Sequence, residues 1–387
     1  MTPDASAFLR VLFWILLVLA VYPFALYPAL AFALSRLRGR PVRKGEGIPR
    51  VTVLIAAHNE AGCIRETIAN KLDLDYPRDR LEIIVVSDAS TDGTDDLVRA
   101  FAPQGVRLVR QEERRGKTSA LNLGVAQATG EILVFSDANS LYDPAALRAL
   151  VRNFADESVG YVTGKMIYVH PEGSATGEGC SAYMRYENLL REWETRLGSI
   201  VGVDGGVDAV RRALYVRLPA DALPDFALPL EVVRQGRRIV YEPAALLRER
   251  SVTHARDEYR MRVRVALRAL WAIRDRPDLL NPLRHGLFAW QLFSHKVLRY
   301  VAFLPLALLL AVNAALALDS GFYAALLLIQ ITCYLGALLG FLLSDRRSVP
   351  RWLSLPYYFV LIQAASCHAI VKLLAGRKIL VWAPRTG

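Results

Sequence analysis

The sequence has little cysteine, and the cysteines it has are spread along the chain. Only four of its 387 residues are cysteines, and the last two lie in apolar runs. They are Cys63, Cys180, Cys333 and Cys367. Disulfide-rich domains and cysteine-type zinc sites need paired spacings. The pattern therefore argues against both and agrees with a reducing compartment for the soluble part.

The sequence also lacks the two common glycine-rich phosphate-binding motifs. No GxGxxG follows the first expected strand (51–57), and no GxxxxGK[ST] occurs anywhere. The sequence therefore lacks the main evidence for a dinucleotide-binding or a P-loop enzyme. Disordered, collagen-like and coiled-coil classes are excluded by composition.

Charge and hydropathy together indicate a mixed architecture. Charged residues make up 22% of the chain, too many for a pure membrane channel, and the net charge is +11. The mean hydropathy of +0.25 is too apolar for an ordinary soluble enzyme. This balance predicts a water-soluble domain flanked by membrane segments.

Four apolar runs are candidates for these segments. The first, 8–34, carries one charge, Arg10, and is long enough to cross a hydrocarbon core of about 30 Å. It has no small-residue cleavage site, so we expect an uncleaved anchor rather than a signal peptide. The other three are 301–318, 321–343 and 353–375, with a tight turn at 319–321 between the first two.

Basic loops predict the orientation. Residues 36–50 hold six Lys and Arg against one acid, Glu46, which places the following domain in the cytoplasm. The basic loop 346–351 fits the same side. A full crossing at 353–375 would send the basic tail outside, including Arg385. Two interpretations stay open: the last run is not a simple crossing, or the short tail overrides the bias.

Between about 50 and 250, short β-rich runs alternate with helical stretches. The expected strands are 51–57, 81–87, 106–110 and 131–136, and the expected helices lie near 62–72, 92–101, 118–128 and 144–154. This alternation predicts an α/β fold with a mostly parallel sheet and helices on both faces. Ligands of such sheets bind beyond the carboxyl ends of the strands.

Three of the four strands end in polar clusters at that edge. The clusters are His58-Asn59-Glu60, 87–94 and 136–140. Any one of them has the simpler explanation of a helix cap or an Asx-turn. Three neighbouring clusters favour a site, and Asp137 with Asn139 supplies two oxygen ligands that suit Mg²⁺ or Mn²⁺.

These clusters resemble a known family when they are taken together. AAHNE (56–60), VSDASTDGT (86–94), RRGKTSALN (114–122) and FSDANS (135–140) are similar, in order and spacing, to family 2 glycosyltransferases of the GT-A, Rossmann-like fold. The resemblance extends from about 50 to 300. It implies an inverting enzyme that uses a nucleotide-sugar donor, most commonly a UDP-sugar.

The resemblance also implies roles for single residues. Ala57 and Glu60 would line the nucleotide pocket, Asp88 would bind the uracil, and Lys117 would lie near the nucleotide. Asp137 would bind both the nucleotide and the metal. Asn139, which stands where the family's metal motif ends in a second acid, would be a neutral ligand.

The catalytic base expected from the resemblance is Asp225, in the stretch LPDFALPL (223–230). A turn aspartate after Pro224 is the alternative. One base without a second catalytic carboxylate fits a single displacement with inversion. Gly205 and Gly206 resemble the family's acceptor-side loop, where Asp204 and Asp208 are further polar candidates and a plain glycine turn is the alternative.

Two basic segments precede the C-terminal runs. HKVLRY (295–300) stands where polymerising members carry QxxRW; Arg299 is retained and would contact the diphosphate. The changed Gln and Trp positions argue against a hyaluronan- or cellulose-synthase type. The stretch 256–276 has seven arginines among apolar residues, which suits anionic lipid headgroups, whereas no motif for nucleic acid accompanies it. A solvated helix packing one face on the domain is the simpler alternative.

The sequence thus predicts an integral protein of the plasma (inner) membrane with a cytoplasmic GT-A domain. Its expected parts are an anchor (1–35), the catalytic domain (36–255), interfacial helices (256–300) and a C-terminal membrane region (301–387). The acceptor would be lipid-linked or a polysaccharide. The alternatives are a processive synthase that extrudes its product and a silent assembly subunit of a polysaccharide machine. A homo-oligomer or polysaccharide-assembly partners are compatible with each.

Overall fold

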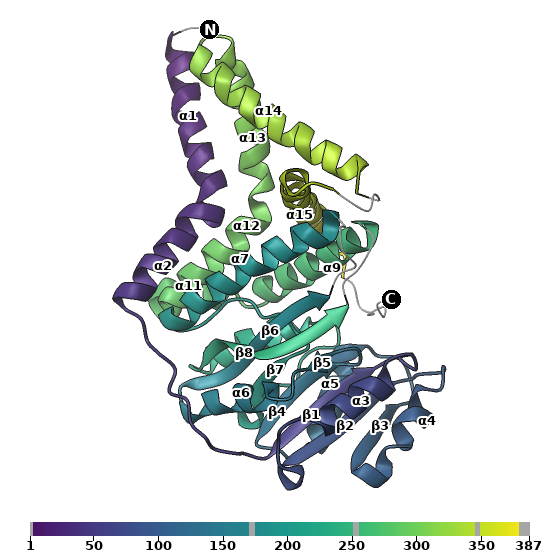
Figure 1. Ribbon diagram of the computed structural model, residues 1–387. Coiled ribbons are helices and arrows are strands. Elements are labelled where there is room, and N and C mark those ends of the chain that lie inside the picture. Colours follow the sequence, from purple (N-terminus) through teal and green to yellow (C-terminus); the bar gives the residue numbers. More distant parts are fainter. Residues whose placement is uncertain (1–2, 170–174, 251–254, 345–348, 379–387) are drawn as a thin grey trace.

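The computed structural model describes residues 3–169, 175–250, 255–344 and 349–378. A twisted sheet with helices on both faces forms the domain, and long apolar helices extend from one side of it (Figure 1). The strands are β1 (Val51–Ala57), β2 (Leu81–Asp88), β3 (Val106–Gln111), β4 (Ile132–Asp137), β5 (Leu141–Tyr142), β6 (Val159–Val169), β7 (Asp208–Arg211) and β8 (Arg238–Arg250).

The sheet has the order β3-β2-β1-β4-β7-β6-β8-β5 and is mixed, with four of its seven strand pairs parallel. β3, β2, β1 and β4 run parallel to one another, whereas β7 runs antiparallel to both β4 and β6. Every side chain of β1 is buried, which agrees with helices on both faces. The carboxyl ends of β1, β2 and β4 therefore meet at one edge.

Helices alternate with these strands and cover the two faces. They are α3 (Ile64–Leu72), α4 (Thr94–Arg99), α5 (Lys117–Gln127), α6 (Ala146–Val151), α7 (Ala175–Leu197), α8 (Pro224–Arg234) and α9 (Ala255–Arg274). The first four lie close to the ranges expected from the sequence. Helices α7 and α9 lie between the sheet and the apolar helices (Figure 1).

Within the described ranges, three helices are long and apolar enough to cross a membrane: Asp4–Leu37, α14 (Gly321–Leu342) and α15 (Arg351–Leu374). The first comprises α1 (Pro3–Val21), a π-helical turn and α2 (Tyr27–Leu37). The run expected at 301–318 forms α13 (Phe303–Ala317), which reaches crossing length only when joined to Leu287–Val301 through a 55° bend. That joined segment contains α11 (Leu287–Leu292) and α12 (Leu298–Val301) and follows the short α10 (Pro282–His285).

Candidate active site

Lys117 lies between Asp137 and Asp225. The resemblance implies metal binding for Asp137 and base catalysis for Asp225. Lys117 begins α5, Asp137 ends β4, and Asp225 lies in the first turn of α8. Lys117 Nζ lies 2.6 Å from Asp137 Oδ1 and 3.4 Å from Asp225 Oδ2. Burial opposes a charged lysine, but the two carboxylates outweigh it and hold the pKa of Lys117 above its usual value. The ammonium is a fixed positive charge between two acids.

The paired glycines lie against both carboxylates. Gly205 and Gly206 each have a φ of +76°, a conformation that side chains rarely adopt. A Cβ atom on Gly205 would lie 2.9 Å from Asp225 Oδ2, and one on Gly206 would lie 3.7 Å from Asp137 Oδ2. The turn therefore needs glycine for its backbone, and at Gly205 also for the space beside the acid.

Asp88 is buried at the end of β2 and organises the loop that leads to Lys117. Its Oδ1 accepts hydrogen bonds from Gln111 Nε2 (2.8 Å) and the Arg115 N–H (2.7 Å), and its Oδ2 accepts one from the Gly116 N–H (2.8 Å). The contact with the nucleotide base implied by the resemblance would add to these bonds. In this structure Asp88 sets the start of α5.

The loop after β1 is bonded to the loop after β2. The Glu60 N–H donates to Thr94 Oγ1 (2.9 Å), and Asn59 Oδ1 accepts from the Thr91 N–H (2.9 Å). Ala57 is buried at the strand end. Burial raises the pKa of the Glu60 carboxyl, and the nearby Asp137 raises it further. Glu60 is thus brought to the same edge as Asp137.

The expected metal ligands are incomplete by themselves. Within the described residues no group of three or more His, Cys, Asp or Glu is placed to hold a metal. Asn139 lies two residues after Asp137, and its amide Nδ2 lies 3.5 Å from Glu249 Oε1. One carboxylate and one amide fit Mg²⁺ or Mn²⁺ only if further oxygens come from elsewhere, such as the phosphates of a ligand.

Two arginines of α9 reach the site, although the sequence analysis assigned their helix to lipid headgroups. Burial lowers the pKa of both guanidinium groups, and the opposing carboxylate charges include Asp137 and Asp225 for Arg264 and Asp225 for Arg268. Arg268 Nη2 also donates to the carbonyl of Ala222 (2.8 Å). The four-residue spacing of these arginines, which puts them on one helix face, is the signal that could have found them.

Helix α5 also holds the chain segment that precedes Asp225. Thr118 Oγ1 donates to the Ala222 carbonyl (2.9 Å), and Asn122 Nδ2 donates to the Leu218 carbonyl (2.8 Å). The Tyr215 hydroxyl donates to Asn122 Oδ1 (2.7 Å). The motif GKTSALN therefore supplies the cation Lys117, and it also supplies Thr118 and Asn122, which hold the segment before Asp225 by hydrogen bonds.

Arg299 is not brought to the site. Its guanidinium pairs with Glu187 on α7 and donates to the Pro23 carbonyl (3.1 Å) and the Tyr186 hydroxyl (2.8 Å). These partners belong to α7 and the N-terminal helix. The contact with a diphosphate that the resemblance implies for Arg299 therefore finds no support in its position.

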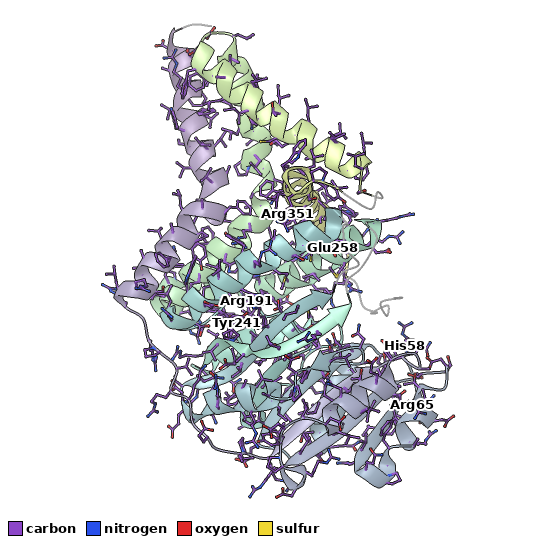
Figure 2. All side chains as sticks on the ribbon, in the orientation of Figure 1. His58, Arg65, Arg191, Tyr241, Glu258 and Arg351 are labelled. Carbon is purple, nitrogen blue, oxygen red and sulfur yellow. The ribbon has the colours of Figure 1, made fainter. Side chains whose placement is uncertain are left out.

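Asp204 is likewise engaged elsewhere. Its Oδ1 lies 2.6 Å from Arg191 Nη2, and both side chains are buried. The Arg191 guanidinium lies 6.0 Å from the centre of the Tyr241 ring, on the sheet below α7 (Figure 2). Asp204 therefore ties the glycine loop to α7.

Asp208 is buried beside the site at the start of β7. The hydroxyls of Tyr161 and Thr163 face it, yet neither of its oxygens has a well-formed hydrogen bond within the described residues. Burial, and then repulsion from Asp225, raise its pKa to about 8. Asp208 therefore keeps its proton to a higher pH than an ordinary aspartate does.

Comparisons with known proteins identify the domain. Residues 52–213 match the model of glycosyl transferase family 2. A probable glycosyltransferase of Bacillus subtilis (strain 168), YdaM, is 32% identical over 234 residues, which are 57% of this chain and 55% of that protein. A poly-β-1,6-N-acetyl-D-glucosamine synthase of Staphylococcus aureus (strain MSSA476) is 29% identical over 203 residues, or 51% of this chain and 48% of that protein. The chain thus spans about half the length of these relatives.

A solved structure is similar over nearly the whole chain. The mannosyltransferase PcManGT from Pyrobaculum calidifontis, in complex with GDP-Man and Mn²⁺, superposes with a TM-score of 0.70 and 27% identity. The match covers 95% of this chain and 99% of that one. The sheet and its covering helices are the GT-A fold expected from the sequence. Over residues 52–213 the chain is therefore similar to the glycosyl transferase family 2 domain.

Proposed function

We propose that this protein transfers a sugar, with inversion, from a nucleotide-sugar donor to an acceptor at the membrane surface. The observation that carries the proposal is the arrangement of Lys117 between Asp137 and Asp225 at the carboxyl edge of the sheet. Donor activation requires a cation near the diphosphate, and acceptor deprotonation requires an acid that serves as base. The arrangement supplies the cation and two acids at different positions.

In this proposal Asp225 accepts the proton of an acceptor hydroxyl. The new bond forms between that oxygen and the anomeric carbon while the bond from that carbon to the diphosphate breaks on the opposite face. The diphosphate leaves with its electron pair. Lys117 and Arg264 carry the positive charge that stabilises it. A divalent ion, held by Asp137 and Asn139, would add a Lewis acid for the diphosphate.

Asp88 and Glu60 border the nucleotide pocket in the same proposal. We retain a UDP-sugar as the expected donor, although the similar mannosyltransferase was solved with GDP-Man, so the nucleotide needs to be tested directly. The catalytic unit is residues 36–255, preceded by the anchor at 1–35 and facing the cytoplasm of the inner membrane. The basic stretch at 36–50 supports this side.

Release of free nucleotide by the detergent-purified protein tests the proposal. The panel contains UDP-, GDP- and dTDP-sugars with Mn²⁺ or Mg²⁺ and a membrane-lipid extract as acceptor. We expect release from one donor, lost in both Asp225→Asn and Asp137→Ala. Arg80→Ala is the matched control, because its exposed side chain pairs with Asp79 before the amino end of β2, at the opposite end of the strand from Asp88. No release from any donor by a folded protein would overturn the proposal.

A processive polysaccharide synthase is the second candidate. It is favoured by the similarity to a poly-β-1,6-N-acetyl-D-glucosamine synthase over 203 residues. The same reactions separate the two candidates, because a synthase yields products of high molecular weight and a single transfer does not.

A further inference from the structure

Helix α15 differs from the other apolar helices in how much of it is covered by protein. Its most apolar window is 39% buried, against 22% for the N-terminal helix and 11% for α14. Figure 1 shows α1, α13 and α14 extending away from the sheet, whereas α15 is seen nearly along its axis beside α7 and α9. The last apolar helix therefore packs on the domain helices α7 and α9 as well as on α14.

Polar contacts join α15 to the first half of α9. The Tyr358 hydroxyl donates to Glu258 Oε1 (2.6 Å) and accepts from Arg262 Nη2 (2.6 Å). The Tyr259 hydroxyl lies 3.1 Å from His368 Nδ1. Charged partners of this kind are costly in a hydrocarbon core but ordinary at its polar boundary.

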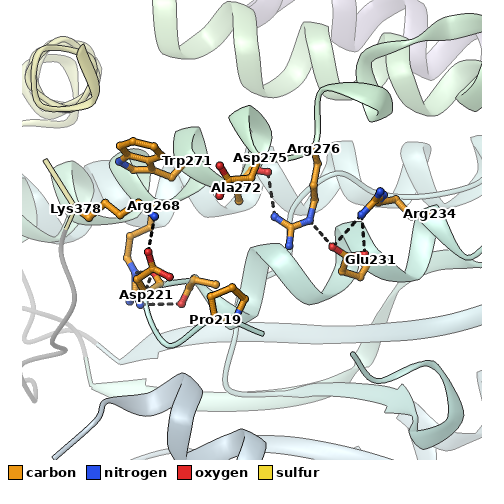
Figure 3. A pocket seen from close by; sticks show the side chains of 11 residues that line it. Pro219, Asp221, Glu231, Arg234, Arg268, Trp271, Ala272, Asp275, Arg276 and Lys378 are labelled. Atoms are coloured by element: carbon orange, nitrogen blue, oxygen red, sulfur yellow. Dashed lines mark hydrogen bonds and ion pairs between the residues drawn. The ribbon is translucent and has the colours of Figure 1, made fainter. Parts of the chain in front are cut away.

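The chain that leaves α15 also ends on α9. The Trp271 indole Nε1 donates to the carbonyl of Arg377 (3.1 Å). Lys378 Nζ lies 4.8 Å from the centre of the Trp271 ring and 2.6 Å from Asp221 Oδ2 (Figure 3). Asp221 belongs to the loop just before α8. A helix that crossed a core of about 30 Å would leave Lys378 on the opposite side from that loop.

The same loop leads to the proposed base, Asp225, in the first turn of α8. Arg268 donates to the carbonyls of Asp221 and Ala222, and Lys378 binds the Asp221 carboxylate. Figure 3 shows Arg268 and Lys378 beside Asp221, with the Trp271 ring above them on α9. Lys378, which follows α15, and Arg268 of helix α9 thus both bind the loop at Asp221, four residues before Asp225.

We propose that α15 lies along the membrane interface on the domain side, and that Lys378 clamps the loop leading to Asp225. The crossing segments are then Asp4–Leu37, the bent pair ending in α13, and α14. This topology puts the basic stretch 36–50, Arg351 and the residues 377–378 on one side, as the charge rule favours. Arg385, the other basic residue of the tail, lies outside the described residues. The clamp rests on the proposed function, whereas the topology does not.

Cysteine labelling tests the topology without any activity. In a variant whose four native cysteines are replaced, one cysteine is appended after Gly387. Two references are Glu113→Cys, exposed in the domain, and Ser320→Cys, in the turn between α13 and α14. A membrane-impermeant maleimide is applied to sealed inside-out and right-side-out vesicles, and labelling is normalised to that in detergent. We expect the appended cysteine to label together with Glu113→Cys. Labelling together with Ser320→Cys would overturn the topology.

Charge reversal tests the clamp. Lys378→Glu is expected to lower kcat about two- to fivefold, the effect of one partly exposed ion pair, with KM for the donor unchanged. The swap Asp221→Lys with Lys378→Asp is expected to restore it. Lys372→Ala is the matched control, because that side chain makes no hydrogen bond or ion pair within the described chain. An unchanged kcat in Lys378→Glu, or no recovery in the swap, would overturn the clamp and leave the proposed function standing.

Discussion

At the residue scale, Lys117 forms ion pairs with both Asp137 and Asp225, the two acids on which the proposed chemistry depends. Its ammonium lies 2.6 Å from Asp137 and 3.4 Å from Asp225, so it lowers the repulsion between two partly buried carboxylates. A donor diphosphate would compete with these acids for the same cation. Lys117 is thus both part of the resting structure and a candidate ligand of the donor.

Replacing Lys117 by methionine keeps the length of the side chain and removes the charge. We expect kcat/KM for the donor to fall by at least about 100-fold, because a fixed cation at a leaving diphosphate acts mainly in the transition state. Steady-state nucleotide release measures it. Arg80→Ala, before the amino end of β2, serves as control, and a loss below about threefold would contradict the role given to Lys117.

Asp208 predicts a pH dependence of stability. Its pKa is raised to about 8 by burial and by Asp225, while an unfolded aspartate titrates near about 4. The folded state then binds the proton that the unfolded state has lost, so the contribution of Asp208 to stability falls as the pH rises from about 4 to 8. Asp208→Asn cannot ionise. We expect the melting temperature of the variant, relative to wild type, to rise across this window by a few degrees and to level off above pH 8. A constant difference from pH 5 to 9 would contradict the assignment.

At the scale of elements, the position of α5 depends on its close approach to the sheet. A Cβ atom on Gly124 would lie 2.8 Å from Leu54 Cδ2 and 2.8 Å from Val86 Cγ2, on β1 and β2. The helix that carries Lys117 therefore packs against the two central strands with no room for a side chain. Its first residue is fixed by Asp88 through the loop before it.

Gly124→Val is expected to lower the free energy of unfolding by about 1–3 kcal/mol, because overpacking forces the helix away from the sheet. Thermal unfolding in detergent checks this. Gly62→Ala, at a position with open space around the new Cβ, is the control. Equal melting temperatures for the two variants would contradict the close packing of α5.

The elements found from the sequence are those with local signals. The first four strands, and the helices between them, follow runs of apolar residues bounded by turn residues, and the turn at 319–321 separates α13 from α14 as expected. The second half of the sheet was missed. β5 has two residues and β7 has four, and β7 enters the sheet between β4 and β6, which only long-range pairing decides.

The residues of the site likewise fall into those that the sequence could place and those that it could not. The carboxyl ends of parallel strands meet at one edge, so Glu60, Asp88 and Asp137 were placed together by topology alone. The approach of Arg264 and Arg268 depends on where α9 packs, and the sequence of that helix equally suited a lipid surface. Arg299 was placed by motif position, and the packing of α12 on α7 put it elsewhere.

At the scale of the whole molecule, a buried polar network joins the N-terminal helix, α7 and the helices before α13. His295 Nδ1 lies 2.7 Å from Glu194 Oε1, and its Nε2 lies 3.0 Å from Glu187 Oε2. The Tyr27 hydroxyl donates to Glu194 Oε1 (2.5 Å), and Arg299 pairs with Glu187. The apolar helices are therefore fixed to the domain by charges as well as by packing.

Glu187→Gln removes the carboxylate shared by Arg299 and His295 and leaves a buried guanidinium without its counter-charge. We expect a loss of about 3–5 kcal/mol in stability, as for other broken buried pairs. The melting temperature in detergent measures it, with the exposed Glu192→Gln of the same helix as control. A variant as stable as this control would show that the network does not hold the two parts together.

The most direct test of the central claim separates binding of the donor from transfer of the sugar. The donor dissociation constant and the single-turnover rate of transfer are measured on one preparation of Asp225→Asn, with the donor found by nucleotide release. We expect a dissociation constant within about threefold of wild type and a transfer rate lowered by at least about 100-fold, because a general base acts on the acceptor alone. Transfer at the wild-type rate would contradict the role of Asp225 and with it the proposed single displacement.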